Sequence, residues 1–201
     1  MIRKSGVGIV DYGSGNIASL RASLLKIGYR PHMLSCAEDF ETAKVIVIPG
    51  VGAFPQAMEQ INYTGLSQPI LEAHEQGKRI VGICVGMQIL AQKGFEIKKT
   101  EGLGLIDGHV QQHPDGLQVG WMSVISAKGN SPEVTNKKFY FNHSYHLVGP
   151  VEQVLYSCRS RTQEHAAIVR KGNVFGIQFH PEKSQREGLN LLGKVIQGEL
   201  S

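Results

Sequence analysis

The chain has 201 residues, of which 41% are hydrophobic and 19% are charged; this composition is typical of a globular protein and excludes an intrinsically disordered one. The formal net charge of +4 is modest and the basic residues are scattered without aromatic residues between them, so we expect no nucleic-acid partner. Three cysteines without a spacing pattern argue against a disulfide framework or a metal site, and the absence of a signal-like or bilayer-length apolar run predicts a cytoplasmic chain without membrane contacts.

The first half of the chain alternates runs typical of strands with apolar residues at helical spacing. Val7–Val10 predicts a strand, and after a glycine-rich turn either Ser14 or Asn16 could cap a helix. Further along we expect strands at 30–34 and 45–48, a helix at 66–75, and a strand that begins at 79. This order predicts a parallel sheet with right-handed crossovers, and such sheets carry their functional sites at the carboxyl ends of the strands.

The strand at 45–48 leads into Pro49–Phe54, a loop in which two glycines flank one valine. Glycines allow backbone amides to adopt conformations that other residues resist. Most Pro-Gly segments are plain connections, and that interpretation stays open here. If a nucleophile lies beside this loop, one of its N–H groups would suit a developing oxyanion.

The stretch Arg79–Leu90 changes from a β-branched run to apolar residues at helical spacing, which continue as far as Ala91. Cys84 stands at the change, between Gly82 and Gly86. A tight strand-to-helix turn between small residues exposes one side chain at the top of a sheet, and the helix directs its N–H groups and positive dipole at it. For a thiol this arrangement favours the thiolate. The pattern therefore indicates a nucleophile, with a buried, inert cysteine as the alternative.

From Gly102 onward the chain predicts short strands, at 104–110, 119–125, 138–141, 154–159, 166–170 and 174–179. Asn130–Pro132 and Lys171–Asn173 are predicted connections, the second a hairpin turn, and Ser184 is expected to cap a C-terminal helix. We interpret these strands as an antiparallel or mixed extension of the sheet. The expected fold class is α/β, with a mostly parallel central sheet flanked by helices, in one domain over residues 1–201.

The run Val174–Phe179 ends in His180-Pro181-Glu182. A histidine at a strand end could act as a general base, and a carboxylate two residues later could hold its ring in one tautomer. Pro181 fixes φ between the two and limits how they move. A single histidine is more often structural than catalytic, but in a chain with a candidate elbow cysteine His180 and Glu182 are candidate partners of Cys84.

Gly82–Gln88 together with Gln178–Glu182 resembles the signature of the class I (triad) glutamine amidotransferases. Asp11–Asn16, Pro49–Gly52 and Phe141–Tyr145 narrow the resemblance to the glutaminase subunits of imidazole glycerol phosphate synthase, which act in histidine biosynthesis. The resemblance implies a flavodoxin-like fold, L-glutamine as the substrate and no cofactor or metal. It also implies a heterodimer in which ammonia passes to a (β/α)8 cyclase subunit that makes imidazole glycerol phosphate and AICAR.

The same resemblance implies roles for residues of this chain. Its catalytic triad is Cys84, His180 and Glu182. Its oxyanion donors are the amides of Gly52 and Val85. Its substrate-binding residues are Gly50, Gln88, His143, Ser144 and Tyr145. Its interface residues are Asn16, Trp121 and Tyr140. A core position is about equally plausible for the two aromatic residues, and Gln88 and Ser144 could otherwise be ordinary helix-surface and turn residues.

The chain departs from the family pattern at Leu117–Met122, where the family usually carries a Pro-His pair followed by Gly-Trp-Asn, and again after Ser144-Tyr145. Both segments lie where family members meet the synthase subunit and the glutamine. A paralogous glutaminase that supplies another synthetase, such as a sugar-amidating enzyme, is therefore the alternative. A cysteine protease, an isomerase-like hydrolase and a non-catalytic scaffold are further alternatives, and ammonia release from glutamine separates the enzymes among them.

Overall fold

The computed structural model describes residues 4–13, 16–127 and 134–200. Its strands are β1 (Val7–Val10), β2 (His32–Leu34), β3 (Val45–Ile48), β4 (Arg79–Ile83), β5 (Ala91–Gly94), β6 (Thr100–Glu101), β7 (Ile106–Gln112), β8 (Gln118–Ser126), β9 (Lys138–His143), β10 (Tyr145–Val148), β11 (Val154–Arg159), β12 (Glu164–Lys171) and β13 (Val174–Ile177). Its helices are α1 (Ile17–Lys26), α2 (Phe54–Tyr63), α3 (Ser67–Glu75), α4 (Val85–Gln88) and α5 (Gln185–Gln197), with short 3-10 turns η1 (Ala37–Phe40), η2 (Val151–Gln153) and η3 (Pro181–Lys183).

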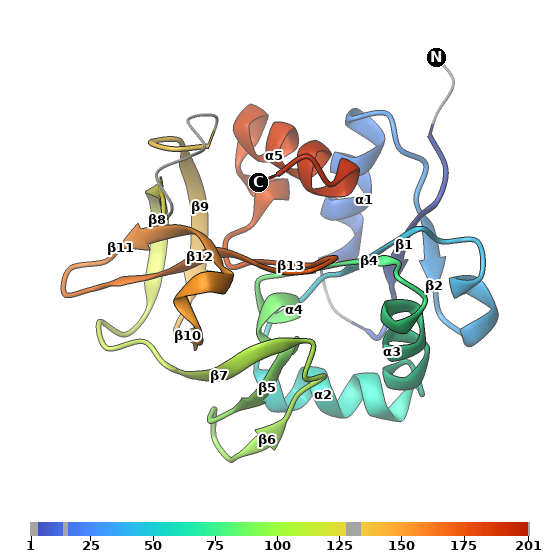
Figure 1. The fold of residues 1–201 in the computed structure, drawn as a ribbon, viewed down its shortest axis with the longest axis horizontal. Helices are drawn as coiled ribbons and strands as arrows, with labels where there is room; N and C mark the ends of the chain where they lie inside the picture. The colour runs from blue at the N-terminus through green and yellow to red at the C-terminus, as the bar shows by residue number, and fades with distance from the viewer. Residues whose placement is uncertain (1–3, 14–15, 128–133, 201) are drawn as a thin grey trace.

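The described strands form two sheets (Figure 1). The larger has the strand order β2-β1-β3-β4-β13-β12-β11-β8-β9, and its first half is parallel, because β1 pairs with β2 and β3, and β4 pairs with β3 and β13, in the parallel sense. Helices cover both faces of this half, with α1 and α5 on one side and α2, α3 and α4 on the other (Figure 1). Every residue of β1, β3 and β13 is accordingly buried, as the apolar runs predict. The expected α/β fold is confirmed.

The second half of the large sheet is antiparallel and adds β12, β11, β8 and β9 in turn. The predicted hairpin is present, since Lys171 pairs with Val174. The expectation that all later strands extend one sheet is wrong for β7, which pairs with β5 and β10 in the smaller sheet β10-β7-β5-β6. The helix expected as far as Ala91 ends at Gln88, and the chain then extends as β5 and gives β7 a parallel partner away from the large sheet.

Two local expectations also need correction, and one helix was not expected at all. The helix α2 is not predicted from the sequence, because it begins directly after the Pro-Gly loop. Asn16 and Ser184 occupy N-cap positions, but neither side chain caps its helix. The Ser184 hydroxyl instead donates to the His180 carbonyl at 2.6 Å and accepts from the Tyr140 amide. Ser14 and the connection at 130–132 lie outside the described residues.

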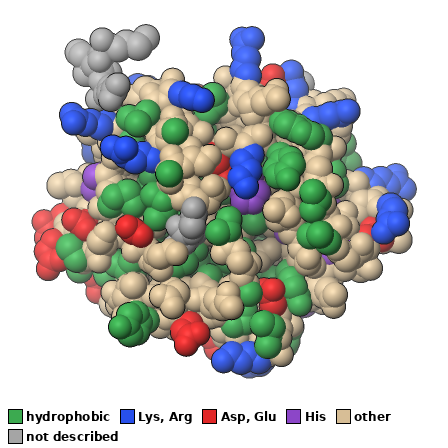
Figure 2. Space-filling view, turned by 180° about the vertical axis from the view of Figure 1, so that it is seen from behind, with side chains coloured by type: hydrophobic (Ala, Val, Ile, Leu, Met, Phe, Trp, Pro, Cys, Tyr) green, Lys and Arg blue, Asp and Glu red, His purple; other side chains and the backbone are tan. Residues whose placement is uncertain are grey.

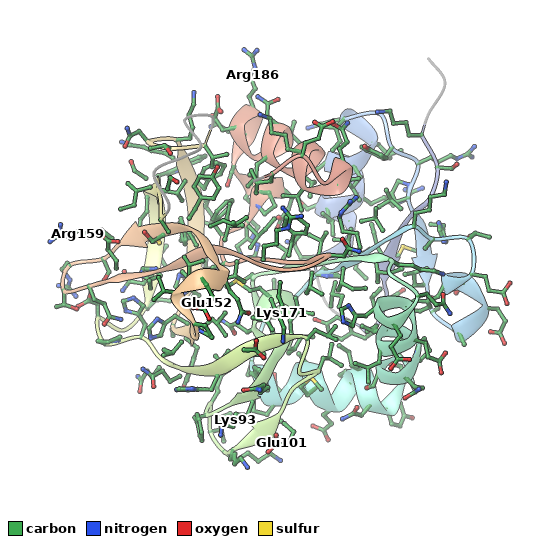
Figure 3. All side chains as sticks on the ribbon, in the orientation of Figure 1. Lys93, Glu101, Glu152, Arg159, Lys171 and Arg186 are labelled. Carbon is green, nitrogen blue, oxygen red and sulfur yellow. The ribbon has the colours of Figure 1, made fainter. Side chains whose placement is uncertain are left out.

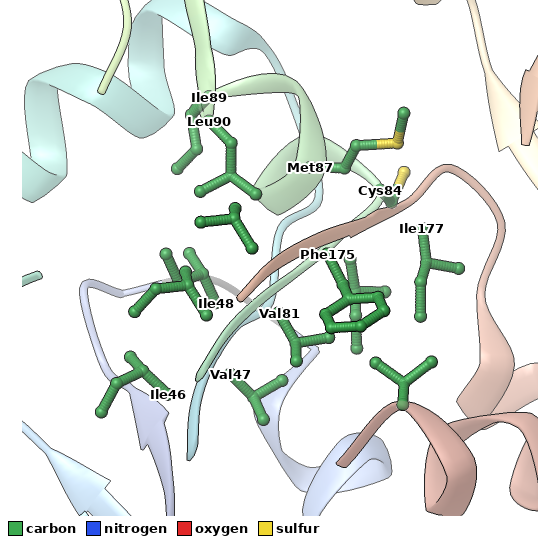
Figure 4. Packing of buried hydrophobic residues seen from close by; sticks show 14 of the residues in the cluster. Ile46, Val47, Ile48, Val81, Cys84, Met87, Ile89, Leu90, Phe175 and Ile177 are labelled. Carbon is green, nitrogen blue, oxygen red and sulfur yellow. The ribbon is translucent and has the colours of Figure 1, made fainter. Parts of the chain in front are cut away.

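The carboxyl ends of the central strands rest on a tightly packed apolar core (Figure 4). Val47 and Val81 pack there with Phe175 and Ile177 of β13, and Cys84 lies next to Ile177, whose carbonyl accepts a bond from the Cys84 amide. Charged side chains such as Arg159 lie at the periphery (Figure 3), and on the rear face the basic side chains stand at separate places (Figure 2). No described helix is long and apolar enough to cross a membrane.

Candidate active site

Cys84 stands at a strained turn between β4 and α4. Its φ of 55° and ψ of −113° are rare for a residue other than glycine and persist only where the surroundings enforce them. Gly82 and Gly86 make the turn possible, because a Cβ on Gly82 would overlap the Gly86 carbonyl and a Cβ on Gly86 would overlap the Ile48 carbonyl. The predicted elbow is present, although its helix has only four residues.

His180 and Glu182 meet Cys84 from the segment that follows β13. His180 Nδ1 lies 2.8 Å from Glu182 Oε1, and the two side chains are only 2% and 1% exposed. Burial opposes a charged imidazole, but hydrogen bonds and charge interactions with Cys84 and Glu182 outweigh it and raise the pKa of His180 to about 9. The ring is therefore protonated at neutral pH, the state in which it can give a proton to a leaving group.

Glu182 is also held from a second side. Asn16 Nδ2 donates a hydrogen bond to Glu182 Oε1, the same oxygen that contacts His180, whereas Oε2 is buried without a partner. Asn16 directly precedes α1, so the turn after β1 reaches the triad. Its role at an interface stays a prediction, and the contact that the structure shows is with the carboxylate.

A cavity of about 230 Å³ opens over Cys84. The residues predicted for the site that line it are Gly52, Cys84, Val85, Gln88, His143, Ser144, Tyr145 and His180. Gly50 does not line the cavity, because it packs so closely on α4 that a Cβ would overlap the Gly86 amide nitrogen. Within the described ranges, no group of three or more His, Cys, Asp or Glu side chains is arranged to hold a metal ion.

The other lining residues are Val51, Glu96, Leu117 and Asn142, of which only Glu96 lies outside the segments singled out in the sequence. Glu96 follows β5, and its Oε2 accepts a hydrogen bond of 2.8 Å from the Phe54 amide at the start of α2. The Asn142 carbonyl lies 3.9 Å from Cys84 Sγ. Glu96 carries no motif in the sequence, so its place in the site becomes visible only when β5 forms and turns it towards the loop before α2.

Gln88 and His143 both hold the turn between β9 and β10. Gln88 is buried, which excludes the helix-surface interpretation, and its Nε2 donates to the Tyr145 carbonyl at 2.8 Å. His143 Nδ1 lies 3.0 Å from the same carbonyl. The two side chains therefore line the cavity and also fix the backbone of Ser144 and Tyr145 beside it.

The two predicted oxyanion donors border the cavity from different sides. Gly52 has a φ of +99°, a conformation that favours glycine, and Tyr12 anchors the start of its loop by donating to the Pro49 carbonyl at 2.6 Å. Val85 is the first residue of α4, where backbone N–H groups have no partner inside the helix. Both amides thus belong to backbone held close to Cys84.

Trp121 lies on the surface and not in the core, since it is 46% exposed. It pairs across the strands with Tyr140, with ring centroids 6.1 Å apart. Val119 is exposed two residues earlier on β8, and Leu117, which lines the cavity, is exposed before it. We call Leu117, Val119 and Trp121 the apolar stripe; it runs away from the mouth of the cavity.

The model of the family described as glutamine amidotransferase class-I matches residues 8–195 of the chain. The imidazole glycerol phosphate synthase subunit HisH of Caldanaerobacter subterraneus subsp. tengcongensis is 39% identical, over 95% of this chain and 98% of that protein. The subunit of the same name from Desulfitobacterium hafniense is 37% identical, over 92% and 91%.

Solved structures share the fold. A structure described as a glutamine amidotransferase aligns with a TM-score of 0.74 at 20% identity, over 96% of this chain and 99% of its own. The structure of PurLQS from Thermotoga maritima aligns with a TM-score of 0.74 at 23% identity, over 99% and 100%. At these identities the likeness concerns the fold alone.

Proposed function

The chain belongs to the class I glutamine amidotransferase family, and from this premise we propose that it is the glutaminase subunit of an imidazole glycerol phosphate synthase. In that role it hydrolyses L-glutamine and delivers ammonia to a cyclase partner in histidine biosynthesis. The observation that carries the proposal is the strained Cys84 with the buried pair of His180 and Glu182 beside it. The names of the relatives favour this partner over a sugar-amidating synthetase.

The three side chains support hydrolysis in two steps through a thioester. Cys84 Sγ attacks the carboxamide carbon of glutamine, and His180 gives its proton to the departing ammonia. Neutral His180 then takes a proton from the water that attacks the thioester, glutamate leaves and the Cys84 sulfur is released. Glu182, bound at Nδ1, holds the ring so that Nε2 serves the reaction.

Glu96 is the group that we assign to the α-ammonium of glutamine. It places a carboxylate on the cavity, and its bond to the Phe54 amide fixes the side chain while one oxygen stays available. Ser144 lines the same cavity and offers its hydroxyl to the substrate. This set suits a small ligand that carries both a charged amino group and a carboxamide.

The amides of Gly52 and Val85 are the proposed donors to the tetrahedral oxyanion. Loss of one such donor typically costs about 10²–10³ in turnover, or roughly 3–4 kcal/mol. Because Gly52 belongs to a loop, its conformation offers a means by which a partner could switch the glutaminase on.

The apolar stripe is the surface that we propose for the partner. Ammonia released into water is protonated, so a partner that uses it has to cover the cavity, and exposed apolar residues beside the cavity mouth suit such a contact. We further propose a heterodimer with a (β/α)8 cyclase, a lyase activity of the joint enzyme and a single amidotransferase domain over residues 1–201. A cytoplasmic location fits a mechanism that needs a reduced Cys84, which is free in the structure.

The test is ammonia release from glutamine by the chain alone and with an imidazole glycerol phosphate synthase cyclase and its nucleotide ligand. We expect strong activation by the cyclase and its complete loss in Cys84→Ala. Cys36→Ala is the matched control, because Cys36 is an exposed free thiol at the N-cap of η1. Its substitution should leave the rate of ammonia release unchanged. A rate of ammonia release that does not change when the cyclase is added would contradict the proposed partner. Ammonia release by Cys84→Ala would contradict the triad.

A further inference from the structure

A buried cluster of four histidines and one cysteine lies behind the turn between β9 and β10. Its members are His113 after β7, His143 on β9, His146 on β10, Cys158 on β11 and His165 on β12, all buried. The ring centroid of His113 lies 4.6 Å from that of His165 and 4.9 Å from that of His146. Only His143 of this set lines the catalytic cavity.

The hydrogen bonds of the cluster fix the positions of its protons. The Asp115 amide donates to His113 Nδ1 at 3.1 Å, so the ring proton of His113 is on Nε2. That Nε2 donates to His165 Nδ1 at 3.2 Å, and His165 Nε2 then donates to Cys158 Sγ at 2.9 Å. In each of these two rings Nδ1 accepts a hydrogen bond and Nε2 donates one, which is possible only for a neutral ring. A second proton on either ring would break the bond that Nδ1 accepts.

His143 and His146 are neutral for a different reason. His143 Nδ1 donates to the Tyr145 carbonyl, which leaves Nε2 buried without a partner, and both nitrogens of His146 are buried without partners. A proton added to either ring would be an unpaired charge in the interior. Burial, followed by repulsion from the neighbouring rings, lowers the pKa of His143 and His146 to about 4.

The surroundings of the cluster offer little to offset a positive charge. His109 on β7 and His180 face it and oppose a further positive charge. Asp115 favours a charged His113 or His165, but its carboxylate accepts a bond from the Thr162 amide. His146 and His165 also line a second cavity of about 290 Å³ together with Asp107 and Glu164. Asp107 is already bound to Lys171 and Gln153, and Glu164 accepts a bond from the Ser157 hydroxyl and acts on Cys158. A ring that gains a proton therefore has to leave the cluster.

The cluster holds the turn that carries Ser144 and Tyr145. The His113 amide donates to the Ser144 carbonyl at 2.8 Å, and His143 donates to that of Tyr145. Ser144 is also the residue at which the chain passes from the large sheet to the small one. We propose that these four histidines are positioning residues that keep this turn in its glutamine-binding conformation, and that they do so only as neutral rings. This rests on the proposed glutaminase function.

The consequence is a steep dependence of glutamine binding on pH. Each ring released into water when the turn opens makes the closed turn about tenfold less favoured per pH unit below the ordinary pKa of 6.5. Between pH 6.5 and 5.5 one ring changes this equilibrium about 5-fold and two rings about 30-fold. Once the open turn outweighs the closed one, which we place in this interval, two or more rings make log KM rise by more than one unit per unit decrease in pH. kcat depends less on this opening, because saturating glutamine holds the turn closed.

Long-range ¹H–¹⁵N spectra of the histidine rings in the full chain test the neutral network without any activity. At pH 7 we expect His113 to carry its proton on Nε2, His143 to carry it on Nδ1, and all four rings of the cluster to be neutral. A charged ring in the cluster at pH 7, or His143 protonated on Nε2, overturns the proposal whether or not the chain hydrolyses glutamine.

Kinetics of the cyclase complex test the effect on binding, with far-UV circular dichroism at each pH to show that the chain stays folded. His146→Phe removes a ring whose nitrogens have no partners, and we expect it to reduce the rise in KM between pH 6.5 and 5.5 at least threefold. His32→Gln, on the edge strand β2, is the control with the full rise. A flat KM, an equal rise in both variants, or a rise that coincides with unfolding overturns the proposal; absence of glutaminase activity contradicts the proposed function instead and leaves the ring spectra to decide.

Discussion

Substitution of glutamine for Glu182 separates the charge of this carboxylate from its hydrogen bonds. The bonds with His180 and Asn16 both end on Oε1, and Oε2 has no partner. A glutamine can place its carbonyl oxygen at the Oε1 position and its NH₂ where Oε2 lies. Glu182→Gln therefore keeps both bonds and removes the negative charge next to the imidazole, at the cost of a buried NH₂ group without an acceptor, which lowers stability at every pH alike.

The size of the effect follows from the pKa of His180. A value of about 9 in place of 6.5 corresponds to roughly 3.4 kcal/mol in favour of the charged ring, at about 1.36 kcal/mol per pKa unit. Cys84 and Glu182 share this stabilisation, so loss of the Glu182 charge is expected to remove about half of it, ~1–2 kcal/mol. We expect kcat at neutral pH to fall about 5- to 30-fold.

The same substitution changes how stability depends on pH. A raised pKa stabilises the folded chain fully below pH 6.5, and this contribution is lost as the pH rises through about 9. Urea unfolding at pH 7 and pH 10 should therefore show a smaller alkaline loss in Glu182→Gln than in the unchanged chain. If the variant keeps kcat within twofold and loses as much stability at pH 10, the charge of Glu182 does not control His180.

Three further predictions concern the elbow, the substrate and the buried histidines. Gly86→Ala should unfold the chain or destabilise it by more than ~3 kcal/mol, because its Cβ meets the Ile48 carbonyl. Gly193→Ala in α5 has no close neighbour and should leave urea unfolding unchanged or stabilise the chain by up to ~1 kcal/mol. Glu96→Gln should raise KM for glutamine about 10- to 100-fold with little change in kcat, and an unchanged KM would contradict its contact with the α-ammonium. The free energy of unfolding should fall as the pH decreases from 6.5 towards 4, by up to ~1.4 kcal/mol per pH unit for each histidine of the cluster. The reason is that the unfolded chain binds protons that the folded chain excludes. Calorimetry that shows no loss of stability by pH 5 would contradict the neutral rings.

The parts of the site that the sequence predicts are those in which chemistry and backbone geometry lie close together in the chain. The position of Cys84 between two glycines specifies an elbow locally. Each glycine is needed because backbone atoms of the same turn or of the adjoining loop come too close to leave room for a Cβ. His180 and Glu182 are two residues apart, so the contact between them needs only the short turn η3. Parallel strands then bring both groups to one sheet edge by topology alone.

The parts that the sequence does not predict depend on where one helix ends. Apolar residues at 87, 90 and 91 fit helical spacing, but α4 stops at Gln88, and Ala91 enters β5 instead. This early end creates the small sheet, and the small sheet places Glu96 on the cavity and His146 opposite His113. The decisive interactions are backbone pairs of β7 with β5 and β10, and the spacing of apolar side chains does not predict which strands pair.

Asn16 shows the same limit in a single residue. Its type and its place before a helix predict an N-cap, and the resemblance predicts an interface, yet its side chain reaches a carboxylate 166 residues away. A cap would use Asn16 Oδ1 to accept from a helix N–H, whereas the bond to Glu182 uses Nδ2 as the donor, so the two partners need different orientations of the side chain. The orientation in the structure is the one that gives the charge-assisted bond. An N-cap prediction from sequence compares only partners that are near in the chain, and a buried charge brought in by the sheet outweighs them.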